Sequence, residues 1–264
     1  MTGYAGFPAR QLSTAAALAA LTAAVVAGCS SSGGGDGNSA AGGITGSLNV
    51  YAASSLTEAF DTIKAQFIKA HPGVSITITY GASSDLATQI GNGAPVDVFA
   101  SAATTNMDSV KSAIDPTNFV TNTMEIAVPP SNPGKISSVK DLAGPGVKVA
   151  VCDPAVPCGV VAQKVFSNAG ITVKPTASEQ DVKSTLSAVE SGEVDAGMVY
   201  VTDVRAAGKD VKGVAIPSAQ NATTEYPIAA LKSAKNLPTA KAFVSYVLSA
   251  AGKKVLMKDG FTAP

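Results

Sequence analysis

Histidine is almost absent from this sequence. The single residue, His71, is followed directly by Pro72 and Gly73, where a helix is expected to end at the surface. The sequence also has no Gly-x-Ser-x-Gly motif, no phosphate-loop lysine motif and no cluster of metal-ligating residues. A serine without a histidine partner lacks the usual base that would activate it as a nucleophile. The sequence therefore does not predict an enzyme.

Charged residues are also few, at 14% of 264 residues, and 19 Lys and Arg are balanced by 19 Asp and Glu. Because there is no excess of positive charge, we do not expect the protein to bind nucleic acid. Any bound anion would have to be held by local dipoles such as backbone N–H groups. The composition, 46% hydrophobic with no tryptophan, is that of a globular protein with one large domain or two smaller ones.

The N-terminus carries an apolar run at residues 15–27 that is too short to span a bilayer as a mature helix. It follows Arg10 and ends in small residues before Cys29, a pattern that resembles the lipobox of bacterial lipoproteins. We therefore expect a signal peptide at 1–28, cleavage before Cys29, and a lipid on its sulfur that anchors the protein to the outer face of the cell membrane. An ordinary secretory signal with a chance cysteine is the alternative.

Residues 29–46 are nearly all Ser, Gly, Asn and Ala, which cannot bury enough apolar surface to fold. We predict a flexible tether there and a folded part that starts near Ser47. The other two cysteines, Cys152 and Cys158, stand close together around two prolines. In an exported protein such a pair most often forms a disulfide. A metal site would need more soft ligands than the sequence offers.

Hydrophobic periodicity predicts alternating short strands and helices, which is typical of parallel sheets with helices on both faces. Two such blocks, with longer strands near Met124 and Ile228 as crossings, predict an α/β fold of two lobes, each a mostly parallel sheet flanked by helices. The first lobe would contain 47–124 and 229–264, and the second 125–228. A single continuous sheet is the alternative. Predicted strands are an opening strand through Leu48 and Val50, then 74–80, 96–100, 124–128, 147–151, 196–201, 214–216 and 228–231. Predicted helices are 56–70, a second helix that carries Leu86 and Ile90, then 104–113, 159–169, 179–190, 239–248 and 250–258.

Several predicted strand-to-helix junctions consist of small, uncharged residues. Ligands of open parallel sheets sit at the carboxyl ends of strands, where such turns converge. The first amides of a helix have no intrahelical acceptor, and small side chains let them approach a ligand closely. The pattern therefore predicts a site for an anion rather than a catalytic site. The junctions are Ala53-Ser54-Ser55, Ala82-Ser83-Ser84, Ser101-Ala102-Ala103 and Pro157-Cys158-Gly159.

At these junctions the sequence resembles the molybdate-binding proteins of ABC importers. Seven fragments match in order over nearly all of 47–264, and together they are specific. They are Tyr51-Ala52-Ala53-Ser54-Ser55-Leu56-Thr57, Tyr80-Gly81-Ala82-Ser83-Ser84-Asp85-Leu86-Ala87, Gly93-Ala94-Pro95-Val96-Asp97-Val98-Phe99-Ala100-Ser101-Ala102, Asp153-Pro154 with Pro157-Cys158-Gly159, Asp181-Val182, Gly197-Met198-Val199-Tyr200-Val201-Thr202-Asp203, and Glu225-Tyr226-Pro227-Ile228-Ala229 with Gly260-Phe261-Thr262.

The resemblance implies a type II periplasmic-binding fold whose two lobes close on molybdate or tungstate. Ser55 and Ser83 would each offer a hydroxyl and a backbone N–H from the first lobe. Cys158 and Val182 would offer backbone N–H groups from the second lobe, and Tyr200 its phenol. The resemblance further implies no cofactor, no catalysis, delivery of the ligand to an ABC permease, and a monomer.

Some alternatives stay open at this point. Ser55 and Ser83 could serve only as helix N-caps. The loop before Cys158 is shorter than in related proteins, so Gly159 is a second candidate for the amide donor. Neutral donors do not specify the size of the anion, so a carrier for sulfate or another tetrahedral oxyanion is the runner-up. An exported serine hydrolase and an adhesin-like interaction module are more distant alternatives.

Overall fold

A computed structural model of the chain describes residues 43–264. The predicted signal peptide, the lipidation site at Cys29 and most of the predicted tether lie outside the described residues. The folded unit begins slightly before Ser47, because the first strand starts at Gly46 and the Thr45 carbonyl oxygen accepts a hydrogen bond of 2.8 Å from the Thr239 hydroxyl.

The first lobe is built on three parallel strands in the order β2-β1-β3, with Leu48 of β1 opposite Ile76 of β2 and Val50 opposite Val98 of β3. Leu48 and Val50 alternate with more exposed neighbours, as expected for a strand that packs against helices. The strands are β1 (Gly46–Ala53), β2 (Val74–Gly81) and β3 (Val98–Ala100).

The second lobe repeats this arrangement with the parallel order β6-β5-β7. The prediction placed 179–190 in one helix and missed β6, because three partly exposed residues at the edge of a sheet carry little hydrophobic signal. The strands are β5 (Val149–Cys152), β6 (Ala177–Glu179), β7 (Ala196–Tyr200) and the short β8 (Lys212–Val214), which pairs with the long strand β4 (Ala113–Val128).

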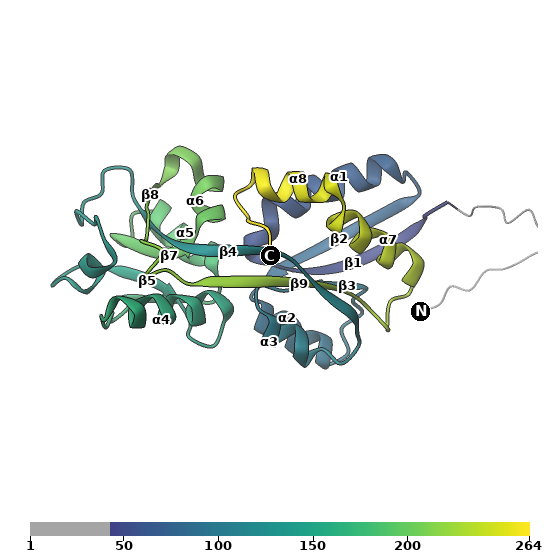
Figure 1. Cartoon of the computed structure of the whole chain (residues 1–264), viewed down its shortest axis with the longest axis horizontal. Helices are drawn as coiled ribbons and strands as arrows, with labels where there is room; N and C mark the ends of the chain where they lie inside the picture. The colour runs from purple at the N-terminus through teal and green to yellow at the C-terminus, as the bar shows by residue number, and fades with distance from the viewer. Residues whose placement is uncertain (1–42) are drawn as a thin grey trace, which may run out of the picture. The chain divides into compact units, whose positions relative to one another are not determined.

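Two long antiparallel strands, β4 (Ala113–Val128) and β9 (Thr223–Leu231), join the lobes (Figure 1). Residues of β4 up to Thr123 pair with β9, and those from Met124 onward pair with β7. The predicted crossings near Met124 and Ile228 are confirmed. The pairing path is continuous, as the single-sheet alternative required, but the packed cores on the two sides of this crossing are separate.

The first eleven residues of β4 were not predicted to be a strand. This segment contains Pro116 and several exposed polar residues, and Asp115 has a left-handed φ of 44°, so the pairing with β9 is irregular there. The predicted helix 104–113 is correspondingly wrong in its second half, since α3 ends at Ser109. Here tertiary pairing overrides a weak local preference.

Helices cover both faces of the first sheet (Figure 1). On one face α1, α7 and α8 enclose a core in which Phe243 packs edge-on against Phe60 at 6.2 Å and Phe67 at 5.3 Å between ring centroids. On the other face α2 and α3 cover a smaller core around Phe99. The helices are α1 (Thr57–Ala70), preceded by the 3-10 turn Ser54–Leu56, α2 (Ser83–Gly91), α3 (Thr104–Ser109), α7 (Leu237–Leu248) and α8 (Ala250–Lys258).

The second lobe has one continuous core around Met198 and Phe166. The short helix after β7 was not predicted, because the predicted strand was extended to Val201, which is the first residue of this helix, and the seven residues of the helix are too few to show a clear helical period. In the described part of the chain, no helix is long and apolar enough to cross a membrane. The helices are α4 (Pro157–Ala169), α5 (Val182–Glu190), α6 (Val201–Ala207) and the 3-10 turns Val139–Ala143 and Gly208–Asp210.

Candidate functional site

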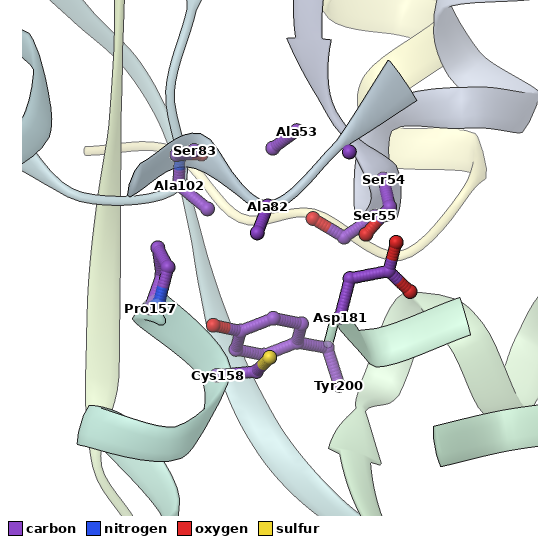
Figure 2. Close-up of a pocket in the computed structure, with 11 residues that line it drawn as sticks. Ala53, Ser54, Ser55, Ala82, Ser83, Ala102, Pro157, Cys158, Asp181 and Tyr200 are labelled. Carbon is purple, nitrogen blue, oxygen red and sulfur yellow. The ribbon is translucent and has the colours of Figure 1, made fainter. Parts of the chain in front are cut away.

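The strand-to-helix junctions of the two lobes meet around one cavity (Figure 2). The cavity volume is about 10 Å³. On the same scale one water molecule needs roughly 10–15 Å³. In this arrangement the cavity holds at most one water molecule, so any larger ligand, a tetrahedral oxyanion included, requires the lobes to move apart. Its walls come from Ala53, Ser54, Ser55, Gly81, Ala82, Ser83 and Ala102 of the first lobe and from Pro157, Cys158, Asp181 and Tyr200 of the second.

Ser83 is the first residue of α2 and is fully buried, at 1% exposure. The N-cap of this helix is Ala82, and no side chain caps it. Instead, the Ser83 hydroxyl oxygen accepts a hydrogen bond of 2.9 Å from the Ala102 backbone N–H. Because its oxygen is already occupied by a donor, the Ser83 hydroxyl proton is free to point toward a ligand. The interpretation of Ser83 as a simple cap is wrong.

Ser55 lies in the 3-10 turn before α1 and is also buried. It caps neither this turn nor α1, whose N-caps are Ala53 and Leu56 without side-chain hydrogen bonds. Its hydroxyl oxygen lies 2.7 Å from the phenol oxygen of Tyr226. The cap interpretation is wrong for Ser55 as well, and both predicted serines line the same cavity.

The predicted amide donors of the second lobe lie at the starts of two helices. Cys158 is the second residue of α4, after Pro157, and it forms the predicted disulfide with Cys152, with the two Cα atoms 5.7 Å apart. At Gly159 a Cβ would lie 1.9 Å from the Asp153 carbonyl oxygen, so only glycine fits this approach of loop to helix. The disulfide prediction is confirmed.

Val182 is the first residue of α5, and its side chain is buried in the core. The cavity is lined at this point by its neighbour Asp181, which caps α5 by accepting a 2.9 Å hydrogen bond from the Ser184 N–H. A first-turn amide such as that of Val182 has no intrahelical acceptor. Its backbone can therefore serve a ligand while its side chain packs in the lobe.

Tyr200 ends β7 and is 1% exposed, with its ring beneath Ala82 in Figure 2. Its phenol oxygen has no hydrogen-bond partner among the described residues. Burial, reinforced by the nearby Tyr226 and Asp203, raises the pKa of Tyr200 well above its ordinary value, so the phenol keeps its proton. An unpaired buried donor costs about 1–3 kcal/mol, and a ligand in this cavity would remove that cost.

The two lobes are also joined by charged groups beside the cavity. Lys183 of α5 forms an ion pair with Glu58 of α1 and lies 3.4 Å from the buried carboxylate of Asp203. Burial lowers the pKa of Lys183, but the charges of Asp203 and Glu58 outweigh it and raise the value overall. The cavity itself is lined by no lysine or arginine, so its donors are neutral.

Residues 48–262 match the family described as bacterial extracellular solute-binding protein. The chain belongs to this family. The molybdate-binding protein ModA of Mycobacterium bovis is 43% identical over 222 residues, which cover 83% of this chain and 85% of that protein. The predicted resemblance to molybdate-binding proteins is therefore confirmed.

Solved structures of solute-binding proteins share the fold. The periplasmic molybdate-binding protein of Azotobacter vinelandii superposes with a TM-score of 0.73 at 21% identity, over 82% of this chain and 99% of that chain. The sulfate-binding protein SubI of Mycobacterium tuberculosis H37Rv gives 0.70 at 18% identity, over 82% of this chain and 86% of that chain. At these identities the likeness concerns the fold alone, and it confirms the predicted α/β binding-protein class.

In this solute-binding protein, His71 is the C-cap of α1 and packs on Phe67, with 4.6 Å between ring centroids. The site is at the other end of α1, whose 14 residues span about 20 Å at the usual helical rise. Residues 43–264 also contain no group of three or more His, Cys, Asp or Glu side chains able to hold a metal ion.

Sequence reasoning missed the residues that surround the predicted donors. Tyr226 lies behind Ser55, although 171 positions separate them, and Lys183 reaches Glu58 across 125 positions. Tyr226 is part of a fragment that matches molybdate-binding proteins, but nothing in that fragment indicates a contact with Ser55. Asp203 likewise belongs to a matching fragment, and only the fold places it beside Lys183.

Proposed function

We propose that this solute-binding protein binds molybdate, and also tungstate, in the cavity between its lobes and delivers it to an ABC permease. The observation that carries this proposal is the buried phenol of Tyr200, which lines the cavity and lacks a partner among the described residues. Membership of the family and the 43% identity to a protein named as molybdate-binding support the choice of ligand.

The donors would be the hydroxyls and amides of Ser55 and Ser83, the amides of Cys158 and Val182, and the phenol of Tyr200. Each hydrogen bond to a charged oxygen contributes on the order of 1.5–3 kcal/mol, and part of this offsets the dehydration of the anion. Donors without acceptors favour a fully ionised dianion. Hydrogen phosphate is disfavoured wherever its own hydroxyl faces one of these donors, and the carboxylate of Asp181 is the only ionised acceptor among the lining residues.

Sulfate is the alternative ligand, since it is also a fully ionised tetrahedral dianion and neutral donors do not measure its size. The likeness to a sulfate-binding structure supports this alternative by fold alone. The sequence identity to a molybdate-binding protein is more than twice as high, at 43% against 18%. Molybdate is therefore the ligand that we favour.

Isothermal titration calorimetry of the purified protein with molybdate, tungstate, sulfate and phosphate tests this proposal. We expect tight binding of the first two, sulfate weaker by at least a hundredfold, and no detectable binding of phosphate. Sulfate binding as tight as molybdate would favour the alternative. Failure of all four anions to bind would reject the oxyanion site.

The remaining parts of the proposal concern the rest of the chain. The lobes would comprise 47–124 with 229–264, and 125–228. A signal peptide at 1–28 would be removed, and a diacylglycerol on Cys29 with the tether 29–46 would hold a monomer at the outer face of the cell membrane. Mass spectrometry of the mature protein tests the anchor, and an unmodified N-terminus beyond Cys29 would reject it.

A further inference from the structure

Tyr226 is a fully buried residue of the crossing strand β9 that does not itself line the cavity. Its ring packs edge-on against Phe261 and Phe119, and it faces Tyr200 with 6.4 Å between ring centroids. Its phenol oxygen lies 2.7 Å from the hydroxyl oxygen of Ser55. Tyr226 therefore contacts two of the proposed anion donors. Its phenol lies within hydrogen-bonding distance of Ser55 in the first lobe, and its ring packs edge-on against Tyr200 of the second.

The direction of the Tyr226–Ser55 hydrogen bond follows from where each proton can go. Burial raises the pKa of Tyr226, so its phenol keeps its proton and needs an acceptor. In the described part of the chain, Ser55 is the side chain that lies in good hydrogen-bonding geometry with this phenol, at 2.7 Å, whereas Asn122 and Tyr200 lie nearby and affect its pKa. The Ser55 proton has another destination, because Ser55 lines the cavity. Both buried hydroxyl protons have an acceptor when Tyr226 donates to Ser55 and Ser55 donates to the ligand.

Ser83 is also linked to β9, through the backbone of Ala102. Its oxygen accepts from the Ala102 N–H, and the Ala102 carbonyl oxygen accepts a hydrogen bond of 2.6 Å from the Thr224 hydroxyl. Thr224 and Tyr226 are two residues apart on β9, so their side chains leave the same face of the strand. Residues on one face of β9 therefore support both cavity serines: Tyr226 contacts Ser55 directly, and Thr224 holds the backbone that donates to Ser83.

We propose that Tyr226 is a positioning residue of the anion site: by donating to one lone pair of the Ser55 oxygen, it leaves the Ser55 hydroxyl proton to point toward the anion. This inference rests on the proposed oxyanion-binding function. In this proposal Tyr226, which does not line the cavity, contributes to the rejection of protonated anions. If Tyr226 did not donate, the Ser55 hydroxyl could rotate its proton away from the cavity and present both lone pairs to the hydroxyl of a ligand such as hydrogen phosphate.

Calorimetric titration of the full mature protein with molybdate, with and without the substitution Tyr226→Phe, tests this proposal. We expect Tyr226→Phe to lower the affinity about tenfold, because Ser55 loses its fixed orientation. In a Ser55→Ala background the same substitution is expected to change the affinity less than twofold, because the hydroxyl through which it acts is gone. The matched control is Tyr246→Phe, whose phenol donates to Gln66 on the first lobe, away from the cavity, and which should leave the affinity unchanged.

A second measurement separates positioning from general loosening of the lobe. Because direct titration of the wild type with phosphate is expected to show no binding, phosphate at high concentration is used to compete with molybdate at pH 7.5, where hydrogen phosphate predominates. The competition should show that Tyr226→Phe lowers the preference for molybdate over phosphate by at least tenfold. Equal losses in the wild-type and Ser55→Ala backgrounds, or an unchanged molybdate-to-phosphate preference, would overturn the proposal. If the wild-type protein binds no oxyanion, the proposed function fails first, whereas tight wild-type binding with an unaffected Tyr226→Phe variant rejects the role of Tyr226 alone.

Discussion

The ammonium nitrogen of Lys183 lies 2.7 Å from a carboxylate oxygen of Glu58, and this ion pair joins α5 of the second lobe to α1 of the first. The two side chains are 26% and 45% exposed, so water screens much of their attraction. Because its two partners belong to different lobes, we expect the pair to break when the lobes separate. If the ligand binds the closed form, any net stabilisation of that form by the ion pair raises the affinity for the ligand.

A double-mutant cycle with Glu58→Gln and Lys183→Gln measures this contribution. We expect a coupling free energy for molybdate binding of about 0.5–1 kcal/mol, which corresponds to a two- to fivefold change in affinity and should vanish in 1 M salt. The cycle cancels the separate effect of each charge on the anion. Glu190→Gln, at the exposed end of α5, is the matched control. Strict additivity of the two substitutions at low salt would contradict the prediction.

Tyr200→Phe removes the unpartnered phenol from the cavity. We expect the affinity for molybdate to fall about tenfold to a hundredfold, since one hydrogen bond to a charged oxygen is lost. The ligand-free protein should be at least as stable as the wild type, because a buried donor without a partner disappears. Calorimetry measures the first effect and urea unfolding without ligand the second. Unchanged affinity would remove Tyr200 from the proposed site.

Replacing both cysteines, as Cys152→Ala with Cys158→Ala, opens the disulfide whose partners are six positions apart. The chain-entropy model predicts a loss of about 2–2.5 kcal/mol in the free energy of unfolding for a loop of this size. We also expect the affinity for molybdate to fall at least threefold, because the start of α4 is no longer clamped to β5. Urea unfolding and calorimetry measure the two effects.

A variant of similar stability tells the clamp apart from a general loss of stability. Val247→Ala truncates a buried side chain of α7 in the core of the first lobe, away from the cavity. It should lower the free energy of unfolding and leave the affinity for molybdate unchanged. If the cysteine variant binds as tightly as the wild type, the disulfide stabilises the fold without positioning the Cys158 amide.

Asp203 makes the stability of the protein depend on pH. Burial raises its pKa to about 6, against the opposing charge of Lys183, whereas 3.8 is the ordinary value. Between these values the unfolded chain loses the Asp203 proton while the folded protein keeps it, so the unfolded state binds fewer protons. The contribution of this group to the free energy of unfolding therefore falls as the pH rises from about 4 to 6.

The variant Asp203→Asn tests this dependence. We expect the difference in unfolding free energy between wild type and variant to shift against the wild type by up to about 3 kcal/mol between pH 4 and pH 7. An asparagine oxygen can still accept the 3.0 Å hydrogen bond that the Tyr200 N–H donates to Asp203, which limits other changes. Urea unfolding at several pH values measures the difference. A difference that stays constant over this range would contradict the prediction.

Local sequence determined the parts of this protein that depend on neighbouring residues. The alternating residues Leu48 and Val50 predict β1, and the spacing of Phe60, Ile63 and Phe67 predicts the buried face of α1. The small residues at the strand-to-helix junctions indicated an anion site, and those junctions do converge on one cavity. The disulfide could be predicted because only two cysteines lie in the folded part and they are close in sequence.

The tertiary structure alone decided what connects the lobes. The first half of β4 becomes a strand because β9 pairs with it, not because its own residues favour one. Tyr226 stands behind Ser55, and Lys183 reaches Glu58, only after the two crossings bring distant segments together. Such contacts leave no periodic signal in the sequence, because a single hydrogen bond or ion pair constrains one residue on each side. Local sequence thus indicates the proposed donor residues, and the fold decides which of their atoms line the cavity.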